Sequence, residues 1–151
     1  MSSYISVNDA QDYFDTRLNS EAWDEHTVSG DNSQEKALAQ ATRIIDRLNS
    51  QGNNSDSEQA NQFPRSGDSV VPEDIEIACC EIALALLDGV DPDIEMENLS
   101  MTSEAYGQTR INYDRSGAAE HILAGVPSAT AWRYLKPYLR DSRYVLLSRV
   151  N

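Results

Sequence analysis

One segment, residues 72–89, restricts the possible folds more than any other part of the chain. It reads PEDIEIACCEIALALLDG, with proline at a favourable first helical position, acidic residues in the first turn and glycine where a helix would end. One apolar stripe of the helical wheel consists of Ile75, Cys79, Ile82 and Leu86. Ile77 and Leu84 lie nearly opposite this stripe. Because only a narrow arc is polar, the sequence predicts a central helix that other elements enclose.

Two amphipathic segments precede this helix and are expected to cover it. The first, residues 8–18, has apolar side chains at helical spacing after Asn8, which we expect to be the N-cap. Trp23 follows and is expected to pack under a connecting turn. The second, residues 33–48, ends before Gly52, a stop signal. Its apolar stripe consists of Ala37, Ala41, Ile44, Ile45 and Leu48.

The remaining segments are of three kinds. Residues 49–62 are polar and low in complexity, which favours a mobile surface loop. Residues 99–113 end in alternating polar and apolar side chains after a glycine, which predicts a short β-hairpin. Residues 141–151 read as a terminal strand or extended arm. We therefore expect a single, mainly α domain over residues 1–151: a small bundle of about four to five helices with a hairpin and a C-terminal arm.

Charge is distributed unevenly along the chain. The net charge is −13 at pH 7; residues 1–100 hold 21 acidic and 5 basic residues, whereas residues 101–151 hold 4 acidic and 7 basic residues. The acidic excess disfavours general nucleic-acid binding, because affinity for phosphate depends on clusters of basic residues. The contrast in sign instead indicates attraction between this chain and a copy or partner of opposite charge.

Residues that could carry chemistry are few. His26 and His121 stand outside any metal-ligand spacing, and the adjacent Cys79 and Cys80 diverge around a helix, so structural roles are favoured. The alternating carboxylates of residues 91–97 resemble a calcium loop but lack glycine at its sixth position. Nucleophile and phosphate-binding glycine motifs are absent from the sequence. We therefore expect no enzymatic activity, no catalytic residue, no metal and no cofactor.

The expected cellular setting follows from the apolar content and from the cysteines, since the adjacent Cys79 and Cys80 cannot form the disulfide framework of a small secreted domain. No apolar run approaches the roughly 20 residues that a membrane span needs. The first residues lack the basic start and apolar core of a secretion signal. We therefore expect a soluble protein of a reducing cytosol, without a membrane partner.

The closing helix, residues 128–139, is the strongest candidate for a binding surface. Ser128 can cap it, and its core-facing stripe consists of Trp132, Leu135 and Leu139. Tyr134 and Tyr138 form an i, i+4 pair on roughly the opposite side, among basic side chains, and tyrosine and arginine are enriched in protein interfaces. The alternative is that both tyrosines cover their own domain, and Pro137 should kink or end the helix. The candidate partner-binding residues are Arg133, Tyr134, Lys136, Tyr138, Arg140, Arg143, Tyr144 and Arg149.

Four short motifs occur in order along the chain: KALAQAT, FPR, VP before the apolar helix, and LKPYL. Together with the N-terminal DAQDYFDTRL and with YGQTRINYD, this order resembles the head-to-tail adaptor proteins of tailed bacteriophages. The resemblance covers residues 4–140. Sequences of this kind are also labelled DnaT-like single-stranded DNA-binding proteins.

The resemblance implies a structural virion protein made in the host bacterial cytoplasm and located in the neck of the virion. It implies a ring, commonly dodecameric, beneath the portal of a DNA-filled capsid. The implied partners are the portal protein, a stopper or tail-terminator protein and further copies of the chain. Genomic DNA would pass without specific binding, since an acidic channel wall repels phosphate. The alternative is a single-stranded DNA-binding module of the DnaT-like type, which would stack bases on the tyrosines of the closing helix.

Overall fold

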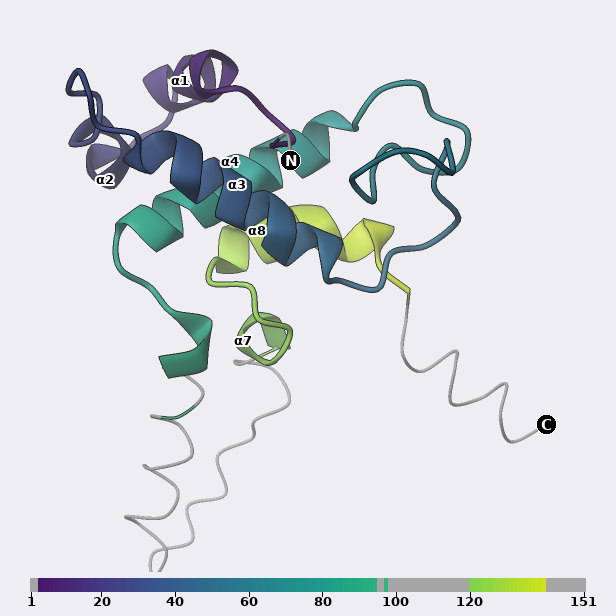
Figure 1. Cartoon of the computed structure of the whole chain (residues 1–151). Helices are drawn as coiled ribbons and strands as arrows, with labels where there is room; N and C mark the ends of the chain where they lie inside the picture. The colour runs from purple at the N-terminus through teal and green to yellow at the C-terminus, as the bar shows by residue number, and fades with distance from the viewer. Residues whose placement is uncertain (1–2, 95–96, 98–119, 141–151) are drawn as a thin grey trace, which may run out of the picture.

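The computed structural model describes residues 3–94, 97 and 120–140 (Figure 1). Its helices confirm the predicted, mainly α fold class. The predicted hairpin at 99–113 and the predicted arm at 141–151 lie outside the described residues. The helical elements are α1 (Val7–Asp15), α2 (Glu21–Asp24), α3 (Ser33–Asp46), α4 (Glu73–Leu87), α7 (Glu120–Leu123), α8 (Ala129–Leu135) and the 3-10 turn η1 (Lys136–Tyr138).

Helix α4 is the central element, as its apolar circumference predicts. It contacts α3 and α8 extensively and also touches α1 and α2. In Figure 1, α3 crosses in front of α4, and α1 lies above both. Pro72 is the N-cap and not the first helical residue, since its extended ψ of 144° places it just before the helix. The buried residues of α4 are Ile75, Ala78, Cys79, Cys80, Glu81, Ile82, Ala83 and Leu84.

Helix α3 covers one side of α4 with the predicted stripe. Ala41 and Ile45 are fully buried, and the helix ends at Asp46, two residues before the predicted end. Thr42 also lies in this interface, where its hydroxyl donates to the Leu38 carbonyl at 2.9 Å and accepts from the Tyr4 amide at 3.0 Å. Tyr4 thereby fixes the N-terminal segment to α3, and its hydroxyl donates to Asp46.

Helix α1 begins at a different cap from the predicted one. Ser6 is the N-cap, and its hydroxyl accepts from the Asp9 amide at 3.1 Å, so the assignment of Asn8 was wrong. Ser6 has the extended backbone that an N-cap needs, and it precedes the first helical turn directly. Trp23 is buried as expected: it stacks on Phe14 with ring centroids 4.5 Å apart.

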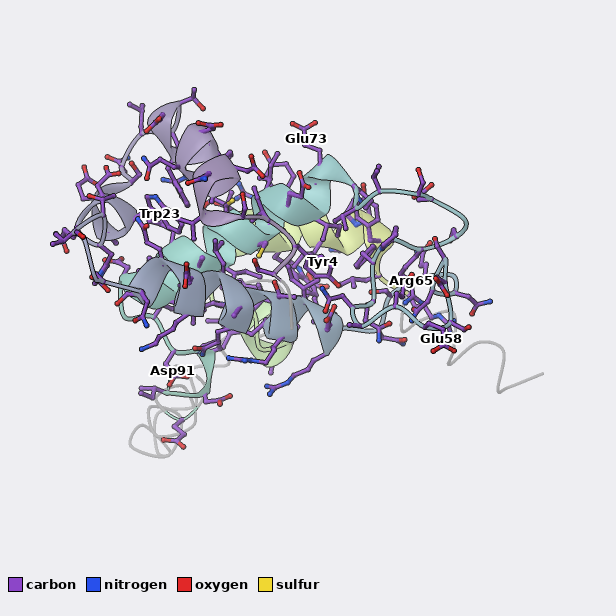
Figure 2. All side chains as sticks on the ribbon, turned by 45° about the horizontal axis from the view of Figure 1, so that its top comes forward. Tyr4, Trp23, Glu58, Arg65, Glu73 and Asp91 are labelled. Carbon is purple, nitrogen blue, oxygen red and sulfur yellow. The ribbon has the colours of Figure 1, made fainter. Side chains whose placement is uncertain are left out.

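The polar segment 49–62 returns along the end of α3 and is joined to Arg65. The Arg65 guanidinium donates to the Gln51 carbonyl at 2.8 Å and to Asn54 Oδ1 at 2.7 Å. It also donates to Gln62 Oε1 at 2.6 Å. Figure 2 shows Arg65 inside the loop that also carries Glu58. The mobility expected for this segment stays a prediction.

A buried carboxylate joins α1 to α4. Glu81 is 3% exposed and accepts hydrogen bonds from Arg17 Nε at 2.6 Å, Arg17 Nη2 at 3.0 Å and the Tyr13 hydroxyl at 2.5 Å. The bond to Glu81 raises the pKa of Arg17, and burial together with the same carboxylate raises the pKa of Tyr13. A buried charge is tolerated only when it is paired in this way. The pairing therefore determines where the end of α1 lies against α4.

Replacing Glu81 with Ala should lower the free energy of unfolding by about 3 kcal/mol, because Arg17 and Tyr13 would lose their shared partner. Urea denaturation followed by circular dichroism measures this change. The control is Glu25→Ala at an exposed position, for which we expect a change below about 0.5 kcal/mol. Equal stability of the two variants would contradict the role of Glu81.

Candidate interaction surfaces

Of the predicted partner-binding residues on the closing helix, some are exposed and others pack against the core. Arg133, Lys136 and Arg140 are exposed, whereas Tyr134 and Tyr138 are half-buried against the hydrophobic core. The remaining three predicted residues, Arg143, Tyr144 and Arg149, lie outside the described residues.

The local structure of this helix follows its sequence closely. Ser128 caps α8 as predicted, with its hydroxyl accepting from the Ala131 amide at 3.1 Å. The helix ends at Leu135 and continues as a 3-10 turn around Pro137. Leu135 is buried at 1% exposure, whereas Trp132 is half-buried. The buried residues of α8 are therefore Ala131 and Leu135.

Tyr138 is engaged within its own domain. Its ring meets Phe63 edge-to-face, with centroids 5.9 Å apart, and its hydroxyl donates to Asp74 Oδ2 at 3.2 Å. Its carbonyl accepts from the Gln51 amide at 2.8 Å. Burial and the bond to Asp74 raise the pKa of Tyr138. These contacts favour the alternative that this tyrosine covers its own domain, and they leave little ring face for a stacked base.

A basic surface on α3 was not predicted from the sequence. Lys36, Gln40, Arg43 and Arg47 are all exposed and follow one another at intervals of four, three and four residues. At 100° per residue they occupy an arc of about 60°, opposite the buried stripe. We call these four residues the basic stripe. The i, i+4, i+7, i+11 spacing of these residues indicates a common helix face. The net charge of the first hundred residues does not reveal this face, because acidic residues outnumber basic ones there.

The basic stripe holds three of the five basic residues in the first hundred positions. The other two are used inside the subunit, Arg17 by Glu81 and Arg65 by the polar loop. Within the described ranges, no ion pair within 4.0 Å includes a residue of the stripe. The stripe is thus a concentrated positive surface within the acidic first hundred residues of the chain.

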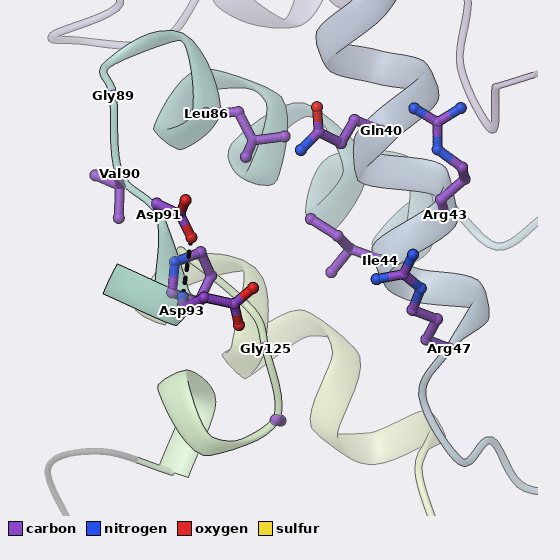
Figure 3. A pocket seen from close by; sticks show the side chains of 12 residues that line it. Gln40, Arg43, Ile44, Arg47, Leu86, Gly89, Val90, Asp91, Asp93 and Gly125 are labelled. Atoms are coloured by element: carbon purple, nitrogen blue, oxygen red, sulfur yellow. Dashed lines mark hydrogen bonds between the residues drawn. The ribbon is translucent and has the colours of Figure 1, made fainter. Parts of the chain in front are cut away.

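A cavity of about 640 Å³ lies beside the basic stripe (Figure 3). Its α3 wall includes Arg43 and Arg47, and its facing wall, after the end of α4, includes Asp91 and Asp93. The Asp93 amide donates to Asp91 Oδ1 at 2.9 Å, which fixes the start of that wall. The two walls therefore carry opposite charge.

An acidic groove lies between α1 and α4, and no residue of α3 lines it. It has a volume of about 470 Å³. Its carboxylates belong to Asp9, Asp12, Glu73 and Glu76. Partial burial and the negative charges of Asp9 and Glu73 raise the pKa of Glu76. The carboxylates of the acidic groove therefore repel one another in the isolated subunit.

The histidines and cysteines take part in internal contacts. His26 Nδ1 lies 2.7 Å from Asp31 Oδ2, and His121 Nδ1 lies 2.8 Å from the Val126 carbonyl oxygen. Burial raises the pKa of Cys79 to about 11 and also raises that of Cys80. Both thiols are therefore protonated near neutral pH and are poor nucleophiles. In the part of the chain that the structure describes, no group of three or more His, Cys, Asp or Glu residues could hold a metal ion.

These features define a small helical protein whose notable surfaces are charged and suited to binding. Residues 1–149 match the family described as "Putative DnaT-like ssDNA binding protein". Because the match covers nearly the whole chain, the protein belongs to this family. Neither a curated protein nor a solved structure matches the chain. No helix among the described residues is long and apolar enough to cross a membrane.

The cysteine environment predicts slow thiol chemistry. At pH 8 the native chain should react with Ellman's reagent at least about 100-fold more slowly than the urea-unfolded chain, because burial hides the sulfur atoms and keeps them protonated. Absorbance of the released thiolate measures both rates. Similar rates in the two states would show that Cys79 and Cys80 are accessible.

The engagement of Tyr138 predicts different effects at the two tyrosines. Tyr138→Phe should lower the free energy of unfolding by about 1 kcal/mol, because Asp74 loses a hydrogen-bond donor. Tyr134→Phe is the matched control, since its hydroxyl forms no hydrogen bond with another described residue. Thermal unfolding of both variants compares them. A larger loss for Tyr134→Phe would contradict the assignment.

Proposed function

We propose that this protein is a structural assembly subunit, a head-to-tail adaptor that forms a ring on the portal of a tailed bacteriophage and joins it to a stopper or tail terminator. The observation that carries the proposal is the separation of charge: an acidic body whose unpaired basic residues before position 100 gather on one helix face. Such a subunit can attract copies of itself and acidic partners over a distance. The sequence resemblance to adaptors supplies the biological setting.

The acidic body also suits the environment of a DNA channel. A wall of repeated acidic subunits repels phosphate, so a duplex could slide along it without adhering. A ring further requires two different faces on each subunit, because each copy meets its two neighbours through different surfaces. The basic stripe and the acidic groove are two such faces.

Single-stranded DNA binding is the second candidate, and the comparisons favour it over the adaptor. The description of the matching family names single-stranded DNA and no virion component. On this candidate the basic stripe, which spans about 16 Å along α3 at 1.5 Å per residue, would contact a few phosphates. The charge of −13 opposes such binding. The engagement of Tyr138 also removes an obvious stacking platform.

Cryo-electron microscopy of the chain mixed with its candidate portal protein tests the adaptor. We expect a ring stacked on the portal, with acidic residues toward the lumen. The chain alone is the control for assembly without a portal. A chain that stays monomeric and leaves the portal bare would contradict the proposal.

A parallel titration addresses the second candidate. Fluorescence anisotropy of labelled oligothymidylate should show no saturable binding if the chain is only an adaptor. Saturable binding that weakens steeply with salt would instead support the single-stranded DNA module.

A further inference from the structure

The basic stripe is a charged helix face with no partner inside the described subunit. Its four residues include three cations, and none of its members is acidic. The buried side of α3 is already used against α4, so the stripe is the face that α3 turns outward. Figure 3 shows Arg43 and Arg47 one turn apart on this helix, beside the cavity. The face is therefore available to a partner of negative charge.

Every copy of the chain carries a surface of matching chemistry. The acidic groove brings together carboxylates from α1 and from the first turn of α4. Within the described residues, none of these carboxylates is paired with a basic side chain. Burial, and after it the negative charges of Asp9 and Glu73, raise the pKa of Glu76, and approaching cations would relieve this repulsion between the carboxylates. A second copy thus gains from supplying the basic stripe at this position.

We propose that the basic stripe of one copy docks on the acidic groove of the next. This inference rests on the proposed assembly function and names the two surfaces that make the contact between subunits. Because α3 does not line the groove, the two surfaces are different faces of one subunit. Each contact leaves one stripe and one groove unused, so association continues until a ring closes.

The surroundings of the stripe favour an acidic protein face over a nucleic-acid strand. None of the four stripe residues is aromatic, so the stripe lacks the aromatic platforms on which single-strand binders stack successive bases. An acidic protein face needs only charge complementarity, which the three cations of the stripe supply.

Two half-defective variants test the contact. Arg43→Glu with Arg47→Glu removes the stripe, and Asp12→Lys with Glu73→Lys removes the groove; all four positions are exposed, so folding should persist. Each variant alone should assemble with a Kd raised at least about tenfold. An equimolar mixture should assemble again, because the substituted stripe is acidic and the substituted groove is basic, so every contact between alternating copies pairs opposite charges. Size-exclusion chromatography with light scattering measures these masses.

The matched control for the groove variant is Glu21→Lys with Glu25→Lys, which makes the same charge change at exposed positions outside the groove and should assemble more nearly like the unmodified chain. Circular dichroism verifies folding of every variant. Assembly of the stripe variant alone and of the groove variant alone, each as tight as that of the unmodified chain, would overturn the inference while leaving the adaptor proposal intact. Loss of oligothymidylate binding in the stripe variant, with assembly unchanged, would overturn it in favour of a DNA face. An unmodified chain that stays monomeric with and without portal would overturn both.

Discussion

The enclosure of α4 is the constraint on which the rest of the structure depends. Apolar surface is less stable in water than in the protein interior. A helix that is apolar around most of its circumference must therefore be covered by other elements on several sides. Helices α3 and α8 cover two of them, and α1 and α2 contribute further contacts. Glu81 is the charged exception on the buried surface, and its bonds to Arg17 and Tyr13 hold α1 in place.

This enclosure determines which surfaces remain for function. The apolar faces of α3 and α8 are used against α4, and Tyr138 packs over the same core through Phe63. The surfaces left outside are therefore mostly polar, with positive charge along α3 and negative charge between α1 and α4. Contacts between such surfaces form quickly and weaken as the salt concentration rises.

Much of the fold was predictable because it depends on periodicity. The patterns of residues 33–48 and 72–89 predicted α3 and α4 to within two residues at each end, and Trp23 is buried after the first helix as expected. The N-cap of α1 was misassigned because Ser6 and Asn8 are both good caps, and backbone conformation selects between them. The candidate site was predictable only in part. The exposure of Arg133, Lys136 and Arg140 matches expectation, but the position of Tyr138 depends on Phe63 and Asp74, which are distant in sequence.

The sequence by itself determined the helical class, the central place of α4 and the acidic character of the chain, because these depend on local spacing and composition. Only the tertiary structure decided which charges are paired inside the subunit. Arg17 and Arg65 look as available in the sequence as Arg43 and Arg47, yet the fold brings Glu81 to the first and the polar loop to the second. Since the partners of a charge come from distant segments, the basic stripe emerges as a surface only when the chain is folded.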